Sequence, residues 1–170
     1  MVIMQLFNTL TKSKEEFKSK EKGKVSVYTC GPTVYGRPHV GNYSSFLMAD
    51  LLCRWLEVLG KKVTHVKNIT DVGHLTADDI ADAGGEDKVE KEARKNKSGE
   101  ITKDDVLAIA RKYEAEFLED EKALNMREPE FRPRATETIK EMVNMIGDLV
   151  ESGFAYETND GVYFSVERFS

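Results

Sequence analysis

The sequence has little of several residue types that mark particular classes of protein. It contains only two cysteines, Cys30 and Cys53, far apart in segments of different character. A scaffold held together by disulfides is therefore not indicated, and we expect both thiols to be reduced. No apolar run reaches the roughly 18 residues that a membrane-crossing helix needs, and residues 1–6 lack the features of a secretory signal. We expect a cytoplasmic protein with no membrane partner.

Positive charge is also in short supply. The 25 lysines and arginines are outnumbered by 30 aspartates and glutamates, which gives a formal net charge of -5. A protein whose whole surface binds nucleic acid has the opposite balance. The composition therefore gives no support for a nucleic-acid partner, and we expect none that is DNA. A tRNA partner is not excluded, because a local basic patch would be enough to bind it.

What the sequence does contain is a pattern of strand, loop, helix and strand. Residues 24–30 form a short β-branched and aromatic run that predicts a buried strand ended by a Gly-Pro turn. After a loop rich in glycine and proline, apolar residues recur every three or four positions over residues 42–59, which predicts an amphipathic helix ended by Gly60. Residues 62–69 alternate and predict a second strand. Together they make a βαβ unit with parallel strands and a right-handed crossover, so we expect the α/β fold class.

The rest of the chain predicts helices and a hairpin. Residues 73–99 are rich in charge and glycine, which predicts a surface loop with a short helix inside it. Its acidic run at 78–87 does not match the spacing of an EF-hand loop, so a solvated face is favoured over a calcium site. Two helices follow, one capped by Thr102 and one starting after Pro133. An Asp-Gly turn at 158–161 between two apolar runs predicts a hairpin.

The predicted elements fall into two groups, residues 1–127 and residues 128–170, of which the second is a helix and a hairpin. A parallel sheet with so few strands cannot cover its edges or fill a domain. We therefore expect the fold to be incomplete as a domain.

The segment with the most chemistry lies at residues 28–42, where the first strand leads into the helix. The carboxyl end of a strand is the usual ligand crevice in parallel sheets, and a helix N-terminus there suits a phosphate. His39 can donate a hydrogen bond to a phosphate oxygen, and Gly41 lets a flat base approach the backbone. Asn42 can cap the helix or donate through its amide. Taken alone, these residues are equally compatible with a plain loop and helix cap.

The string at residues 28–42 resembles the first signature of class I aminoacyl-tRNA synthetases, the His-Ile-Gly-His motif. It resembles specifically the cysteinyl form, in which Cys-Gly-Pro-Thr-Val-Tyr precedes the motif, although the second histidine is Asn42 here, a familiar variant. Other stretches resemble the same family in the same order, at residues 7–11, 68–71, 123–125 and 133–136. The resemblance covers nearly all of the chain. It implies that residues 1–127 form the first half of a class I synthetase Rossmann-like nucleotide-binding domain. It also implies that the helix and hairpin of residues 128–170 lead into the family's inserted connective region.

The resemblance also implies roles for individual residues of the nucleotide site. His39 and Asn42 match the catalytic contacts to the phosphates of ATP, which binds with Mg²⁺. Gly41 matches the close approach of the backbone to adenine. Gly31 and Thr33 would line the adenylate pocket.

Two further residues match groups that recognise the substrate cysteine. Cys30 matches the first of four ligands of a Zn²⁺ ion that binds the substrate thiolate. Zinc prefers sulfur and would reject the harder hydroxyl of serine at binding. Thr70 matches a residue near the substrate's amino group. The alternatives are a small buried cysteine at a strand end and a threonine that bonds its own backbone.

Other candidate side chains have simpler interpretations. Arg37 could touch a phosphate or be exposed. His65 lies in the middle of a strand and is expected to be structural, and Cys53 is expected to be a core residue. His74 follows the crevice, where it is either a loop residue or a substrate contact.

The resemblance implies that the whole enzyme joins ATP and L-cysteine as cysteinyl-adenylate and transfers the cysteinyl group to tRNA(Cys). The family's other three zinc ligands, and the Lys-Met-Ser-Lys-Ser loop that stabilises the transferring phosphates, come from a second half of the fold. Residues 1–170 do not supply them, and the basic run at 94–98 lies in the wrong element to substitute. We therefore expect this chain alone to be inactive in cysteine activation.

Three other functions remain open from the sequence. One is a cysteine ligase of the same superfamily that joins cysteine to an amino sugar through the same adenylate. Another is a short paralogue that acts as a binding or regulatory module. The third is a generic α/β nucleotide-binding domain, against which stabilisation by zinc and cysteine would argue.

Overall fold

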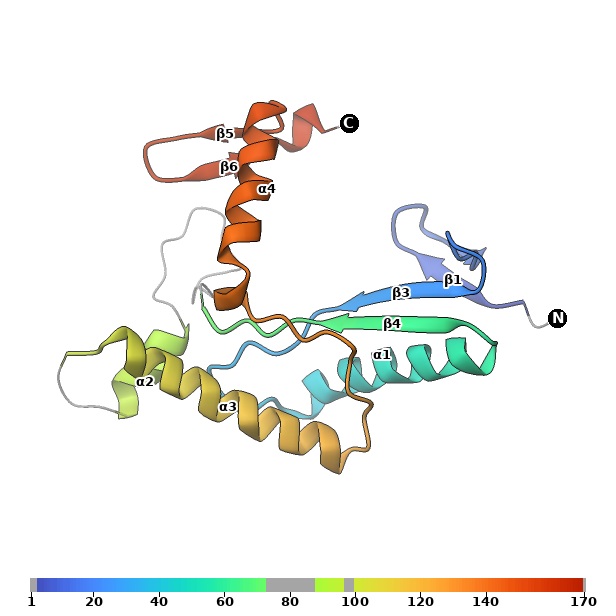
Figure 1. Ribbon diagram of the computed structural model, residues 1–170, viewed down its shortest axis with the longest axis horizontal. Helices are drawn as coiled ribbons and strands as arrows, with labels where there is room; N and C mark the ends of the chain where they lie inside the picture. Colours follow the sequence, from blue (N-terminus) through green and yellow to red (C-terminus); the bar gives the residue numbers. More distant parts are fainter. Residues whose placement is uncertain (1–2, 73–87, 97–99, 170) are drawn as a thin grey trace. The chain divides into compact units, whose positions relative to one another are not determined.

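The computed structural model describes residues 3–72, 88–96 and 100–169. The chain divides into two compact units, Met1–Pro133 and Arg134–Ser170. The first unit is built on the predicted βαβ arrangement: strand β3 (Lys24–Thr29), helix α1 (Val40–Val58) and strand β4 (Lys62–Lys67). The two strands pair in parallel over their full lengths, and α1 runs alongside them (Figure 1). The α/β fold class with a parallel strand pair is confirmed.

Helix α1 begins and ends where local chemistry dictates. His39 is its N-cap in an extended conformation, so the helix starts at Val40 rather than at the predicted Asn42. At the other end Gly60, just past the C-cap, has a φ of 76°. This is the left-handed conformation that glycine adopts with least strain after a helix, and it confirms the predicted end of α1.

Two more helices follow β4 in the first unit. Helix α2 (Lys88–Asn96) lies within the charged stretch where the sequence predicts a short helix, and helix α3 (Lys103–Ala123) follows it. The Asp105 N–H donates to the Thr102 hydroxyl (3.3 Å), and the Thr102 N–H donates to the Asp105 carboxylate (2.9 Å). This reciprocal capping box confirms the predicted start of α3. The alternative calcium site at residues 78–87 and the candidate His74 lie outside the described residues.

Two clusters of buried side chains hold the first unit together. One packs α1 against the strand pair and consists of Val25, Cys53, Leu56 and Val63. Cys53 is only 2 % exposed, so its predicted place in the core is confirmed. The other cluster joins α1 to α2, α3 and the loop after β3. At its centre the rings of Phe46 and Phe117 meet edge to face, with centroids 5.3 Å apart.

After α3 the chain runs back along the outer edge of β4. The Lys67 N–H donates to the Phe131 carbonyl (3.0 Å), and the Phe131 N–H donates to the His65 carbonyl (3.2 Å). Further along, the Ile69 N–H donates to the Pro133 carbonyl (2.8 Å). These bonds cover a strand edge that would otherwise be open, and they explain why the first unit extends to Pro133. The functional division at residue 127 stays a prediction.

A buried ion cluster ties β4 to α3. Lys67 is only 1 % exposed, and its Nζ lies 2.6 Å from Glu121 Oε1. The other oxygen of the same carboxylate lies 2.7 Å from Arg132 Nη2. Breaking a buried pair by removing one partner typically costs about 3–5 kcal/mol, because it leaves an uncompensated charge. The cluster therefore fixes the end of β4 against α3.

The sequence pattern gives no indication of an antiparallel hairpin before β3. It is formed by β1 (Gln5–Asn8) and β2 (Ser13–Glu16). Every residue of β2 is exposed, so the alternation of apolar and polar residues that marks a half-buried strand is absent. The turn is set by local groups: Asn8 Oδ1 accepts from the Leu10 N–H (3.0 Å), and Lys12 has a φ of 54°.

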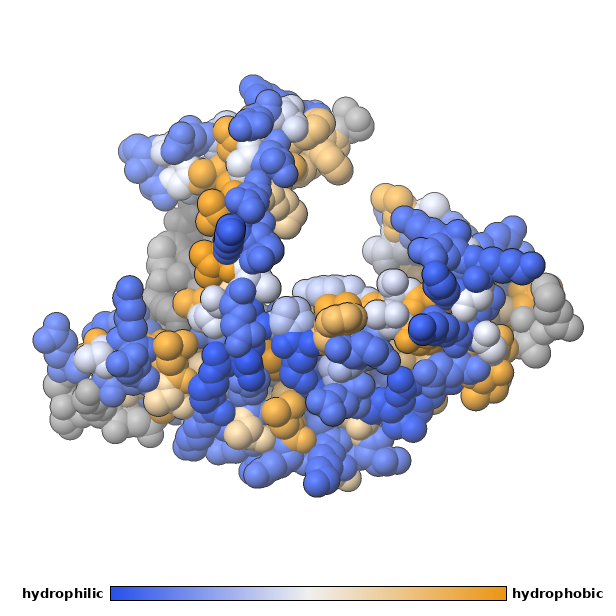
Figure 2. Space-filling model, viewed as in Figure 1, coloured by the Kyte–Doolittle hydropathy of each residue, from blue (hydrophilic) through white to orange (hydrophobic). Residues whose placement is uncertain are grey.

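The second unit contains the predicted helix and hairpin. Helix α4 (Ile139–Glu151) is followed by the antiparallel strands β5 (Ala155–Glu157) and β6 (Val162–Phe164). Short 3₁₀ turns lie at Ala135–Glu137 and Val166–Arg168. Apolar side chains remain exposed along α4, among them Ile139, Val143 and Ile146 (Figure 2). Within the described residues, no helix has the length and hydropathy needed to cross a membrane.

Candidate functional site

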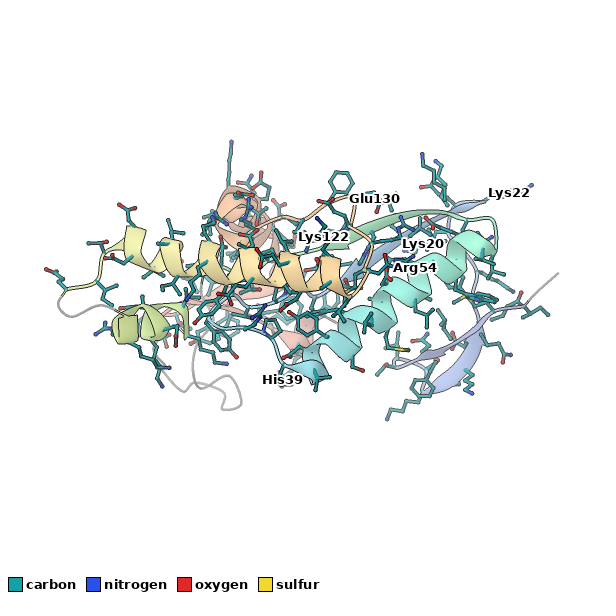
Figure 3. All side chains as sticks on the ribbon, turned by 90° about the horizontal axis from the view of Figure 1, so that it is seen from below. Lys20, Lys22, His39, Arg54, Lys122 and Glu130 are labelled. Carbon is teal, nitrogen blue, oxygen red and sulfur yellow. The ribbon has the colours of Figure 1, made fainter. Side chains whose placement is uncertain are left out.

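A hollow lies between β3 and α1, at the carboxyl end of the parallel pair. Its volume is about 330 Å³, and its wall includes Gly31, Thr33, Arg37, His39 and Asn42. Small-molecule sites commonly occupy roughly 300–1,000 Å³, and parallel sheets bind ligands at this end. His39 stands at the start of α1 (Figure 3). Four of the residues predicted for the nucleotide site thus line one cavity.

The side chains of His39 and Asn42 form a reciprocal cap at the start of α1. The Gly41 N–H donates to His39 Nδ1 (3.0 Å), and the His39 N–H donates to Asn42 Oδ1 (3.1 Å). A neutral imidazole whose Nδ1 accepts a bond carries its proton on Nε2. Asn42 uses its oxygen in the cap and keeps the two N–H groups of its amide. The cap therefore leaves the Nε2–H of His39 and the amide N–H groups of Asn42 available as donors, and both side chains line the hollow.

Gly41 makes room for this cap. A Cβ atom at position 41 would lie 2.8 Å from His39 Cε1 and 3.1 Å from His39 Nδ1. Any side chain would therefore displace the imidazole from the position in which it accepts the Gly41 N–H. This steric role is separate from the predicted approach of Gly41 to adenine, which stays a prediction.

Gly31 lies so close to the end of β4 that no side chain fits. A Cβ atom there would lie 1.7 Å from the carbonyl oxygen of Asn68. The Asn68 side chain completes the junction, because its Oδ1 accepts from the Gly31 N–H and from the Tyr28 hydroxyl, both at 3.1 Å. Asn68 thus links the two strand ends. Sequence reasoning missed this role, since a bond across 37 positions leaves no local pattern.

Beyond the strand ends, the two chain segments continue side by side. Thr33 and Thr70 form an isolated parallel bridge. The Val34 N–H donates to the Thr70 carbonyl (3.1 Å), and the Thr70 N–H donates to the Pro32 carbonyl (3.0 Å). The Thr70 hydroxyl accepts from Asn68 Nδ2 (3.2 Å), so it bonds a side chain rather than its own backbone. Thr70 is therefore adjacent to the wall of the hollow.

Cys30 is exposed just past the end of β3, so the alternative of a buried core cysteine is wrong. It is not among the residues that line the hollow. The described residues contain no group of three or more His, Cys, Asp or Glu side chains that could hold a metal ion. Zinc sites use at least three protein ligands. The described part of the chain therefore does not form a zinc site by itself.

Arg37 is bound to α3. Its Nε donates to Asp120 Oδ2 (2.9 Å) and its Nη2 donates to Asp120 Oδ1 (2.8 Å), while the Tyr43 hydroxyl donates to Oδ2 (2.7 Å). The bonds from Arg37 and then Tyr43 hold the pKa of the Asp120 carboxyl below its usual value. Burial, and next the bond to Asp120, raise the pKa of the Tyr43 hydroxyl. Sequence reasoning missed both Asp120 and Tyr43.

His65 is buried in β4, as expected for a structural residue. Its Nε2 lies 2.8 Å from the Thr29 hydroxyl at the end of β3. Burial is the main cause that lowers the pKa of His65, and the charge of Lys67 adds to it. The neutral imidazole therefore helps to hold the two strand ends together.

Comparison with known proteins connects this geometry to a family. A family profile described as tRNA synthetases class I (C) catalytic domain matches residues 16–170. A protein of Salinibacter ruber named cysteine--tRNA ligase is 50 % identical over 163 residues, which cover 96 % of this chain and 31 % of that relative. Relatives with the same name are 42 % identical in Chlorobium chlorochromatii (98 % of this chain, 33 % of the relative) and 40 % identical in Methanosarcina mazei (98 % and 31 %).

The chain spans about a third of the length of these curated relatives. The profile match contains both strands of the parallel pair, the hollow and the cap on α1, as well as α4 and the second hairpin. It confirms, at the level of the family, the resemblance carried by the string at residues 28–42. The chain belongs to the family of class I tRNA synthetase (C) catalytic domains.

Proposed function

We propose that the whole protein is a cysteine--tRNA ligase. It activates L-cysteine with ATP to form cysteinyl-adenylate and then transfers the cysteinyl group to tRNA(Cys). The observation that carries the proposal is the cap on α1, which leaves donors on His39 and Asn42 at the wall of a hollow. This arrangement occurs in a chain whose family and relatives are synthetases of this kind.

In the activation step, a carboxylate oxygen of cysteine attacks the α-phosphorus of ATP, and the bond to pyrophosphate breaks. His39 Nε2–H and the Asn42 amide donate hydrogen bonds to phosphate oxygens, and the N-terminus of α1 adds the positive end of its dipole. The work of these groups is to orient the phosphates and stabilise their charge. Mg²⁺ accompanies the ATP.

The remaining contacts to the adenylate come from the glycine-rich loop and the end of β4. Gly31 and Thr33 lie against the adenylate, and Gly41 allows the adenine ring to approach the backbone. The Thr70 hydroxyl, beside Thr33, accepts a hydrogen bond from the amino group of the substrate cysteine. A side chain at position 31 would collide with the Asn68 carbonyl, and one at position 41 would displace the His39 ring, so both glycines keep the wall of the hollow in place.

A zinc ion would supply recognition of the substrate thiol, with Cys30 as one of its ligands. The exposed thiol of Cys30 fits that part, but the described residues offer no second and third ligand beside it. Zinc binding by the whole protein therefore depends on ligands from outside the described residues.

We infer that residues 1–170 alone do not activate cysteine. Arg37 is the one lysine or arginine among the described residues that line the hollow, and its guanidinium is already paired with Asp120. The described wall of the hollow would thus offer no free cationic side chain to the charge that develops on the transferring phosphates. Cysteine-dependent ATP–pyrophosphate exchange by the isolated chain would contradict this inference.

Binding of ATP to the 170-residue chain tests the site itself, and isothermal titration calorimetry would measure it. We expect His39→Ala and Asn42→Ala each to weaken ATP binding by about tenfold, the loss of one charge-assisted hydrogen bond. Ser44→Ala, an exposed residue of the same helix, should change it by less than about twofold. Equal affinities for wild type and His39→Ala would contradict the proposed site.

The acceptor of the cysteinyl group decides between tRNA and an amino sugar. The names of the relatives favour tRNA. Whole protein that charges tRNA(Cys) with labelled cysteine would support the ligase, whereas transfer only to an amino sugar would support the other enzyme. A cytoplasmic location is part of the same proposal.

A further inference from the structure

Asp120 binds the chain on both sides of the His39–Asn42 cap. Arg37 precedes the cap by two residues and Tyr43 follows it directly, and both donate to the same carboxylate on α3. The separation in sequence is 83 positions for Arg37 and 77 for Tyr43. One distant side chain thus binds the two residues that flank residues 38–42, the stretch that carries the phosphate donors.

The three bonds fix both the distance and the orientation of the groups that they join, which a single bond would not do. The guanidinium of Arg37 meets the carboxylate with two parallel bonds, an arrangement that fixes orientation as well as distance. Tyr43 adds a third bond to one of the same oxygens at 2.7 Å. An aspartate is ionised at neutral pH, and the bonds from Arg37 and then Tyr43 lower the pKa of Asp120 further.

We propose that Asp120 is a positioning residue of the hollow. By binding Arg37 and Tyr43 from α3, it fixes the turn between them and so orients the imidazole of His39 and the amide of Asn42. The effect of Asp120 on ATP affinity rests on the proposed function, whereas its effect on the geometry of the cap does not. Asp120 itself is not among the residues that line the hollow.

The packing around Asp120 allows the charge to be removed without unfolding the chain. The Tyr43 ring stacks on Phe117, with centroids 6.2 Å apart and planes 15° apart, and meets Phe46 edge to face. We expect these contacts to stay in place when Asp120 becomes asparagine, because neither ring touches the substituted oxygen through anything but the Tyr43 hydroxyl bond. Asp120→Asn keeps the shape of the side chain but loses the ion pair and one acceptor, so its effect should concentrate on the turn.

The cap offers two readouts that do not require a ligand. One is the hydrogen exchange rate of the Gly41 amide, which is bonded to His39 Nδ1. The other is the pair of imidazole nitrogen shifts of His39, which report whether the proton stays on Nε2. Both are measured by NMR on the isotope-labelled 170-residue chain at neutral pH.

We expect Asp120→Asn to speed exchange at Gly41 by about tenfold, because the turn opens more often once its anchor is weakened. The His39 nitrogen shifts should move toward a mixture of the two neutral tautomers. Amides in the centre of β3 should change by less than about twofold. Tyr43→Phe, which removes one of the three bonds, should give a smaller change in the same direction.

Glu119→Gln is the matched control, since it removes one negative charge from the neighbouring exposed residue of α3. If Asp120→Asn and Glu119→Gln give the same Gly41 exchange rate and the same His39 shifts, Asp120 does not position the cap. ATP titrations of the same samples then separate the two proposals. A loosened cap with no ATP binding in any sample, wild type included, supports the positioning role and contradicts the nucleotide site.

Discussion

The junction between β3 and α1 and the hairpin of β1 and β2 are stabilised in opposite ways. At the junction, the bonds that matter join residues far apart: Asn68 to Gly31, and Asp120 to Arg37 and Tyr43. In the hairpin the side-chain bonds are local and exposed, such as those of Asn8 and Thr11 with Glu15. Geometry at the junction is therefore set by the whole first unit, while the hairpin depends on its own residues.

This difference predicts where a substitution will be costly. A residue at the junction contacts Asn68, just past the end of β4, or Asp120 on α3. The positions of β4 and α3 are fixed by two buried clusters and by the Lys67–Glu121 pair. A substitution at the junction therefore disturbs these partners as well. In the hairpin, water replaces a lost partner at little cost.

The largest effect is expected for Gly31→Ala. The added Cβ would overlap the Asn68 carbonyl, which is backbone and cannot move aside. We expect a loss of about 3 kcal/mol or more in the free energy of unfolding, measured by urea denaturation. Gly36→Ala is the control within the same loop, because a Cβ there meets nothing within 4 Å. Equal free energies of unfolding for the two variants would contradict the claim that close long-range contacts fix the junction.

Two asparagines allow a matched test. Asn68→Ala leaves the Gly31 N–H and the Tyr28 hydroxyl without their acceptor, and should cost about 2 kcal/mol. Asn8→Ala removes bonds to Leu10 and Glu15 at the surface, and should cost less than about 0.5 kcal/mol. Urea denaturation of both variants measures the difference. A larger loss for Asn8→Ala would reverse the comparison.

The pH dependence of stability should follow the strand pair rather than the hairpin. Burial lowers the folded-state pKa of His65, while the unfolded chain titrates near about 6.5. Below that pH the unfolded state binds a proton that the folded state resists, so stability is lost as pH falls from about 6.5 to the lower folded pKa. Urea denaturation between pH 5 and 8 should show this slope, and His65→Asn should flatten it. A slope unchanged in His65→Asn would assign the effect elsewhere.

The smallest effect is expected for Glu15→Gln. The bond from Thr11 lowers the pKa of Glu15, and the bond from Asn8 adds to this, yet the carboxylate is fully exposed. We expect no measurable change in the urea midpoint at pH 7 and no change in Gly41 hydrogen exchange. Asp120 also has a lowered pKa. If Glu15→Gln changed Gly41 hydrogen exchange as much as Asp120→Asn, the loss of charge alone, rather than the bonds to the flanks of the cap, would explain the change.

Features with a local pattern could be predicted from the sequence. The period of α1, the glycine after it, the Thr102 cap and the Asp-Gly turn each follow from neighbouring residues. The family string at residues 28–42 identified four side chains or glycines that line one hollow. The start of α1 differed by two residues, because an imidazole served as the cap in place of the asparagine.

The partners of the site could not be predicted in this way. Asn68, Asp120 and the Lys67–Glu121 pair act across tens of positions, and nothing in the residues beside them marks the choice of partner. Gly41 is a second case: its clash with the ring of His39 depends on the rotamer that the cap selects. The hairpin of β1 and β2 was missed for another reason, since its exposed strands carry no alternating apolar pattern.

The most direct test is an NMR titration of the labelled 170-residue chain with ATP and Mg²⁺. The account predicts that the largest shifts occur at His39, Gly41 and Asn42, that the His39 proton stays on Nε2, and that the amides of β1 and β2 do not move. Shifts concentrated away from residues 31–42, or no shifts at millimolar ATP with the chain folded, would contradict it.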